Sequence, residues 1–148
     1  MKELSRNKRA YFDYDILEKI EAGIELLGFE VKAAKSGKID LSGSYARLKD
    51  EQAWLVGASI SPYQPKNTPA EYDPGRDRRL LLTKKELKTL SGKHKEAGLT
   101  VVPLRAYIKG RLVKIELGLA RSKKKWDKRD TIKKRESDKE IRRTFKNK

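Results

Sequence analysis

The sequence has no cysteine, a single histidine and no long run of apolar residues. Without cysteine, the chain has neither a disulfide framework nor a thiolate metal site. No apolar segment approaches the roughly 18 residues that a membrane-spanning helix needs, and residues 1–10 lack the apolar core of a signal peptide. We therefore expect a cytoplasmic protein with no segment that crosses a membrane.

Residue types that usually carry catalysis are also scarce. The one histidine, His94, lies between two lysines, where an exposed surface residue is the ordinary interpretation. The sequence has no zinc-ligand set and no phosphate-binding loop of the P-loop type. Glu18, Glu21 and Glu25 lie close together, and paired carboxylates can perform acid–base work, but most such groups are solvated or ion-paired. We expect no enzyme, no metal and no cofactor, and this shortage disfavours a nuclease.

Positive charge is what the chain has in excess. Its formal net charge is +16, and residues 121–148 contain 14 Lys or Arg against 5 Asp or Glu. Such a charge predicts a polyanionic partner, which means RNA, DNA or an anionic membrane surface. The membrane is the weakest of the three, because the basic segment offers no broad apolar face.

We interpret residues 121–148 as a basic tail that follows a domain at residues 1–120. The apolar residues of the tail are few and form no continuous stripe: Trp126, Ile132, Ile141 and Phe145. The tail has no proline or glycine and is rich in good helix formers. We expect it to be disordered when free and helical when a polyanion neutralises it. The alternative is a solvated charge run without a specific role.

The segment at residues 10–27 fits two patterns. Its leucines and isoleucines suggest a helix, but apolar residues at nearly every even position fit a strand better, and Gly23 is a poor residue for a helix interior. We predict a long, bent strand with Glu21 on its outward face. Residues 1–9 are expected to be a short basic arm.

The remaining segments predict a small β protein. We expect a short helix at 29–36, strands at 41–48 and 53–60 around a turn, a long loop at 61–79, and a helix that begins at the capping box Thr83–Glu86 and ends at Gly98. A hairpin turns at Lys109-Gly110, with alternating residues predicted to face inward: Val102, Leu104, Ala106, Ile108, Val113, Ile115, Leu117 and Leu119. Lys114 then faces outward. Five or six short strands with two or three short helices indicate a mainly β, small antiparallel barrel.

Aromatic and basic residues are interleaved at several places, as in proteins that bind nucleic acids. Tyr45 is followed closely by Arg47, and Lys35 and Lys38 flank a glycine. Arg76, Arg78 and Arg79 crowd one loop. Two basic patches on one barrel are expected, although each motif alone is weak because a tyrosine in a strand is more often a packing residue.

Several short motifs, in order along the chain, carry a family resemblance. They are Asn7-Lys8-Arg9-Ala10, Glu21-Ala22-Gly23-Ile24, Glu30-Val31-Lys32, Ser44-Tyr45, Ile60-Ser61-Pro62-Tyr63, Asp73-Pro74 with Arg76, Arg78-Arg79-Leu80-Leu81-Leu82, and Trp126-Asp127-Lys128-Arg129. With these motifs the chain resembles the SsrA-binding, or small protein B, family of bacterial trans-translation. The resemblance implies an OB-like barrel that binds the tRNA-like domain of transfer-messenger RNA and delivers this RNA to stalled ribosomes. It also implies a tail that becomes helical near the decoding centre of the small subunit, against ribosomal RNA.

The resemblance implies that Glu21, Leu81 and Lys114 bind RNA. Together with the basic and aromatic candidates, the predicted RNA-binding set is Glu21, Lys35, Lys38, Tyr45, Arg78, Arg79, Leu81 and Lys114. The residues expected to be directed to the ribosome are Lys123, Lys124, Trp126, Asp127, Lys128 and Arg129. Two positions depart from the family pattern: Trp126 stands where His or Tyr is frequent, and Lys35 where Arg is common.

Three leucines in a row allow a more specific expectation. If Leu80 and Leu82 face the core, Leu81 is exposed and free to pack on a sugar or a base. We expect a monomer that binds RNA and no membrane. The alternatives are a ribosomal structural protein and a general OB-fold protein for single-stranded nucleic acid.

Overall fold

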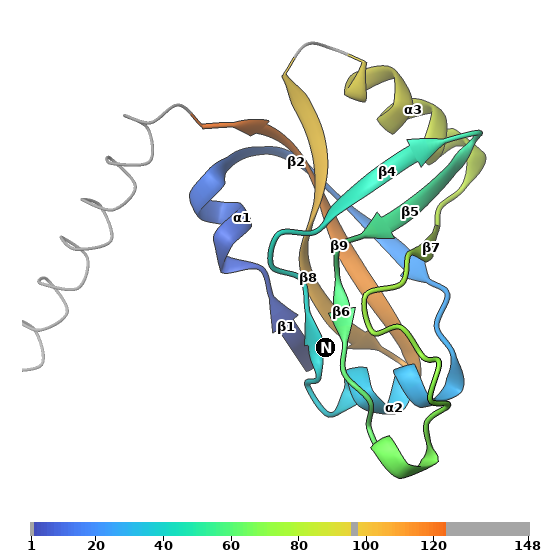
Figure 1. The fold of residues 1–148 in the computed structure, drawn as a ribbon. Helices are drawn as coiled ribbons and strands as arrows, with labels where there is room; N and C mark the ends of the chain where they lie inside the picture. The colour runs from blue at the N-terminus through green and yellow to red at the C-terminus, as the bar shows by residue number, and fades with distance from the viewer. Residues whose placement is uncertain (1, 96–97, 124–148) are drawn as a thin grey trace, which may run out of the picture.

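The strands of the computed structural model, which describes residues 2–95 and 98–123, form a seven-stranded sheet in the order β1-β8-β9-β2-β7-β5-β4 and a two-stranded sheet of β3 and β6 (Figure 1). The strands are β1 (Lys2–Arg6), β2 (Tyr14–Ile24), β3 (Ile39–Asp40), β4 (Tyr45–Lys49), β5 (Gln52–Val56), β6 (Ser59–Ile60), β7 (Arg78–Leu81), β8 (Leu99–Lys109) and β9 (Leu112–Ser122). The helices are α1 (Lys8–Asp13), α2 (Gly28–Lys35), the 3₁₀ turn η1 (Pro65–Asn67) and α3 (Lys84–His94).

All these strand pairs are antiparallel, and the sheet curls until β4 at one edge contacts β8 near the other. The prediction of a mainly β, antiparallel barrel with a few short helices is therefore confirmed. Among the described residues, no helix is long and apolar enough to cross a membrane.

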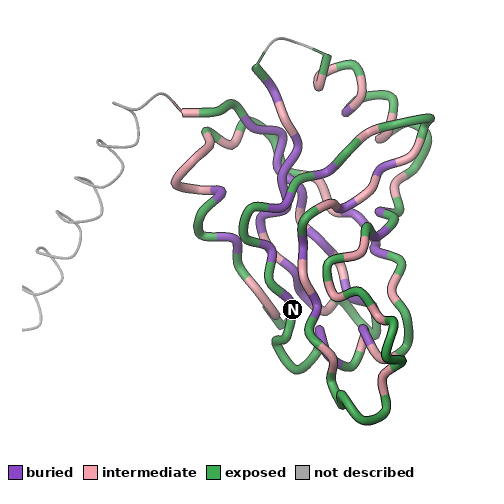
Figure 2. The backbone as a smooth tube through the Cα atoms, viewed as in Figure 1, coloured by how far each residue is buried: buried purple, intermediate pink, exposed green. Residues whose placement is uncertain are grey.

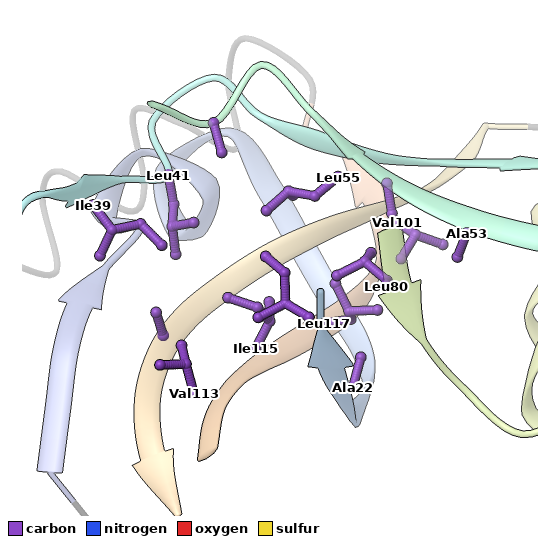
Figure 3. Close-up of a cluster of buried hydrophobic side chains, with 14 of the residues drawn as sticks. Ala22, Ile39, Leu41, Ala53, Leu55, Leu80, Val101, Val113, Ile115 and Leu117 are labelled. Atoms are coloured by element: carbon purple, nitrogen blue, oxygen red, sulfur yellow. The ribbon is translucent and has the colours of Figure 1, made fainter. Parts of the chain in front are cut away.

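The core fills the inside of the curled sheet (Figures 2 and 3). The alternation predicted for β9 is confirmed, because Val113, Ile115, Leu117 and Leu119 are all buried in this one cluster. Leu80 is buried as well, whereas Leu81 is 49% exposed. Leu82 packs partly buried against the same cluster.

The alternation of β8 is interrupted by a bulge. The register with β9 shifts between Pro103 and Arg105, so the extra residue, Leu104, changes the face on which earlier side chains lie. Val102 and Leu104 therefore pack in a second, smaller cluster with Ala10 of α1. Both residues are buried as predicted, but in a different cluster from Ala106 and the inward residues of β9, because simple alternation cannot anticipate a bulge.

The N-terminal region differs from the expected arm and long strand. Residues 2–6 form β1, which pairs with β8, and residues 8–13 form α1, so only the part of the predicted strand that became β2 is confirmed. Asn7 explains the helix, because its buried side chain caps α1 by accepting from the Ala10 N–H at 3.1 Å. Its amide also donates to the backbone oxygens of Leu41 and Pro103 and so ties α1 to the barrel.

The middle of the chain follows the predicted order with shorter elements. Of the expected strand at 41–48, only the part from Tyr45 is a strand, β4, and the short strand β3 lies before it. The expected strand at 53–60 divides into β5 and β6. Asp50 and Glu51 both have positive φ in the tight turn between β4 and β5. The capping box that begins α3 is confirmed, since Thr83 and Glu86 exchange backbone and side-chain hydrogen bonds at 2.9 and 3.1 Å.

Candidate nucleic-acid interface

One face of the sheet points away from the core and gathers four of the predicted residues. Leu81 of β7 pairs with Gly23 of β2, Gly23 with Lys114 of β9, and Lys114 with Tyr107 of β8. Directly paired residues of antiparallel strands lie on the same face, and so do residues two apart in one strand. Glu21 and Arg79 therefore lie on the same face, in rows next to this one, and we call the six residues together the outer face.

Gly23 gives the outer face its shape, and the sequence reasoning did not identify its role. A Cβ atom built on Gly23 would lie 3.1 Å from the Cβ of Leu81. The missing side chain thus leaves room for Leu81 to lie over β2, where it remains about half exposed. An exposed leucine in this position offers an apolar surface to a base or sugar.

Glu21 is held in place by two neighbours. The Tyr107 hydroxyl donates to Oε2 at 2.5 Å, and the Lys109 ammonium lies 3.3 Å from Oε1. The hydrogen bond from Tyr107 is the main reason that the pKa of Glu21 is lowered, with further contributions from Lys109 and Lys114. Glu21 is therefore an ionised acceptor at neutral pH.

A further cation lies next to this carboxylate group, beside a second carboxylate. Arg105 of β8 donates at 3.2 Å to Glu116 of β9, the residue that pairs with Glu21 of β2, and its guanidinium lies 4.8 Å from the centre of the Tyr107 ring. Lysine and arginine contacts to phosphates position a nucleic acid, whereas acceptors and apolar groups read base edges. The outer face has all three kinds of group side by side.

Arg78 lies elsewhere, and its predicted contact with RNA is wrong. Its side chain has no exposed surface, because it points inward from β7 and donates to Glu30 at 2.6 and 3.0 Å. Arg76 donates to the same carboxylate, and so does the Tyr72 hydroxyl at 3.0 Å. The motif residues Glu30, Arg76 and Arg78 thus join α2 to the loop before β7.

The charge of this buried cluster is fixed by its hydrogen bonds. Burial alone raises the pKa of Glu30, but hydrogen bonds from Arg76, from the Leu27 backbone N–H and from Arg78 outweigh burial and lower it to about 2. Glu30 is also the residue that caps the first turn of α2, since it accepts from Leu27 N at 2.8 Å. Its role in the structure is therefore architectural.

The other predicted residues lie outside the outer face. Lys35 ends α2, and Lys38 follows it, with its ammonium bound to the backbone oxygens of Pro62 and Tyr63 at 3.3 and 3.4 Å. Tyr45 begins β4 and borders a cavity of about 410 Å³ beside α1. Within residues 2–95 and 98–123, no three His, Asp or Glu side chains gather as a metal ion would require.

The structure describes only the first residue of the ribosome-directed set. Lys123 follows β9, where its backbone N–H donates to the Asp13 oxygen at 2.9 Å and its ammonium to the Tyr11 oxygen at 3.2 Å. β9 itself ends at Ser122, two residues beyond the expected domain boundary. The other predicted tail residues lie outside the described part of the chain: Lys124, Trp126, Asp127, Lys128 and Arg129.

Comparison with known proteins matches almost the whole chain. The family model of the SmpB protein matches residues 4–147. The SsrA-binding protein of Thermosynechococcus vestitus is 47% identical over 99% of this chain and 96% of its own. That of Carboxydothermus hydrogenoformans is 48% identical over 95% and 93%. A chain in the solved structure described as "tmRNA-SmpB: a journey to the center of the bacterial ribosome" is 49% identical, with a TM-score of 0.68, over 82% of this chain and 85% of that one.

Proposed function

The chain belongs to the SmpB protein family, and we propose that it binds the tRNA-like domain of transfer-messenger RNA and delivers this RNA to stalled ribosomes for trans-translation. Its partners are then this RNA and the bacterial ribosome. The solved structure that contains a similar chain is described as one of tmRNA-SmpB and the bacterial ribosome. The role is that of a binding protein that works in the cytoplasm and needs no catalytic step.

The observation that carries the proposal is the arrangement of the outer face. Glu21, Leu81 and Lys114 come from three different strands, yet the sheet register brings them into two adjacent rows on one side. This side combines an acceptor, an exposed apolar group and cations. We propose that the barrel, residues 1–120, holds the RNA with this face and with Arg79 at its edge.

The remaining basic residues have secondary roles in this proposal. Lys35, Lys38 and Tyr45 extend the RNA contact onto α2 and β4. The tail, residues 121–148, acts at the decoding centre of the small subunit against ribosomal RNA. Its ribosome-directed residues are Lys123, Lys124, Trp126, Asp127, Lys128 and Arg129, and it is proposed to become helical there.

The test is RNA selectivity. The purified protein should bind a transcript of the tRNA-like domain more tightly than an unstructured RNA of equal length, and transfer-messenger RNA should be the RNA that co-purifies at moderate salt. Glu21→Ala and Lys114→Ala should weaken this binding, while Lys85→Ala, which removes an exposed charge from α3, should change it little. Equal affinity for both RNAs would favour a general single-strand-binding protein and contradict the proposal.

A further inference from the structure

We propose that Tyr107 is a positioning residue that holds Glu21 as a fixed acceptor for the exocyclic amino group of an unpaired RNA base. The inference rests on the proposed function, because it requires that the outer face binds RNA. It adds a ligand chemistry, in which Glu21 accepts a hydrogen bond from a base. It also adds a residue, Tyr107, whose own hydrogen bond orients Glu21 for this contact.

Tyr107 is placed to act through Glu21 and not on RNA directly. It lies on β8, whereas Glu21 lies on β2, and β9 runs between these two strands. The Tyr107 side chain therefore reaches across β9 to donate to Glu21 at 2.5 Å. Only 2% of Tyr107 is exposed, so a bound RNA cannot make more than marginal contact with it.

The bond from Tyr107 uses one oxygen of Glu21 and leaves acceptor capacity on the other. A carboxylate has about four acceptor positions. Within the described part of the chain, the hydrogen bonds to Oε1 come from Lys109 alone, at 3.3 Å, and the Lys109 side chain is 60% exposed. Oε1 of Glu21 can thus accept a hydrogen bond from a ligand, either in place of the Lys109 ammonium or in addition to it.

The ligand that suits Glu21 is a base edge, because a carboxylate repels phosphates. Exocyclic amino groups of bases donate to Asp and Glu, and in RNA such edges are accessible mainly where bases are unpaired. Lys109 and Lys114 offset the negative charge for the neighbouring phosphates. Leu81 lies over Gly23, two residues along β2, and can pack on the same base.

Fixing the side chain also explains why a buried tyrosine is used. A glutamate that is free to rotate loses conformational entropy when it binds, and a preorganised one does not. Phenylalanine at position 107 would fill the same space without the hydroxyl. The Tyr107→Phe variant therefore separates the hydrogen bond from the packing of the ring.

The experiment is a double-mutant cycle measured as affinity for the tRNA-like domain transcript. Tyr107→Phe should weaken binding by about tenfold. In a Glu21→Ala background the same substitution should weaken it by less than about twofold, because there is nothing left to position. Tyr72→Phe is the matched control, since Tyr72 also donates to a carboxylate, that of Glu30, but away from the outer face. Its effect should be the same with and without Glu21.

A second measurement identifies the ligand chemistry with the unaltered protein. Unpaired bases of the transcript are replaced one at a time by analogues that lack the exocyclic amino group. One replacement should weaken binding to the wild-type chain and have little effect on Glu21→Ala. If no replacement does so, the base-reading role is wrong.

The outcomes also separate this inference from the proposed function. If Glu21→Ala weakens binding but Tyr107→Phe does not, or if the two effects add in full, Tyr107 has no positioning role and the RNA-binding proposal stands. If Glu21→Ala leaves affinity unchanged, the assignment of Glu21 to RNA binding fails, and this inference fails with it.

Discussion

Replacing Glu30 by glutamine should destabilise the protein strongly without touching the outer face. Glu30 and Arg78 both have fully buried side chains, and the carboxylate is the counterion of Arg78 as well as of the half-buried Arg76. Glutamine keeps the size and one acceptor oxygen but removes the charge. Arg78 is then a buried cation without a counterion.

Two routes give a similar magnitude for this loss. The pKa of Glu30 is about 2 instead of the ordinary 4.5, and each unit of pKa corresponds to about 1.4 kcal/mol, which amounts to roughly 3 kcal/mol. Breaking a buried ion pair by removing one partner typically costs about 3–5 kcal/mol. We expect Glu30→Gln to lower the free energy of unfolding by about 3 kcal/mol at pH 7.

The measurement is urea unfolding at several pH values. Because the pKa of Glu30 is lowered in the folded state, its contribution is present above pH 4.5 and is lost as the pH falls towards 2. The difference between wild type and Glu30→Gln should therefore shrink across this range. Glu18→Gln is the control, since Glu18 forms an exposed pair with Lys93 that should contribute at most about 1 kcal/mol. A variant as stable as wild type, or a difference independent of pH, would refute this reasoning.

Three further predictions concern the outer face. Leu81→Ala should reduce RNA affinity with little change in melting temperature, whereas Leu80→Ala should cost about 2–5 kcal/mol of stability; equal loss of stability in both would contradict the exposure of Leu81. Gly23→Ala should displace Leu81 and weaken RNA binding, measured by RNA titration, while circular dichroism shows that the chain stays folded. Unchanged affinity would show that the position of Leu81 is unimportant. Lys114→Ala should reduce the slope of log affinity against log salt by about one, and an unchanged slope would place this lysine away from phosphates.

Where buried and exposed side chains alternate regularly along a strand, the sequence was a reliable guide to the fold. Local sequence patterns correctly predicted three features: the inward residues of β9, the exposure of Leu81 and the capping box of α3. In each case the tertiary packing is consistent with the local pattern. The bulge at Leu104 does not follow from any local pattern, because it depends on how β8 meets β9 and α1. The sequence interpretation missed the helix cap at Asn7, because the period-two pattern that follows it led to a strand.

The candidate site was predictable in part for a similar reason. Residue type and alternation indicated that Glu21 and Lys114 face outward, but only the strand register shows that they lie on the same side as Leu81. Arg78 was misplaced because an arginine is normally exposed, and its burial depends on Glu30, 48 residues earlier in the chain. Tyr107 could have been noticed, since alternation puts it on the opposite face from Ala106.

The division of labour between barrel and tail is the central claim, and one truncation tests it most directly. A stop after Lys123 keeps all of β9 and the hydrogen bond from Lys123 to Asp13, and removes the rest of the tail. The same protein is assayed for affinity to the tRNA-like domain and for peptide tagging on stalled ribosomes. The account predicts affinity within a few-fold of wild type and loss of tagging. Normal tagging, or loss of RNA binding together with tagging, would contradict it.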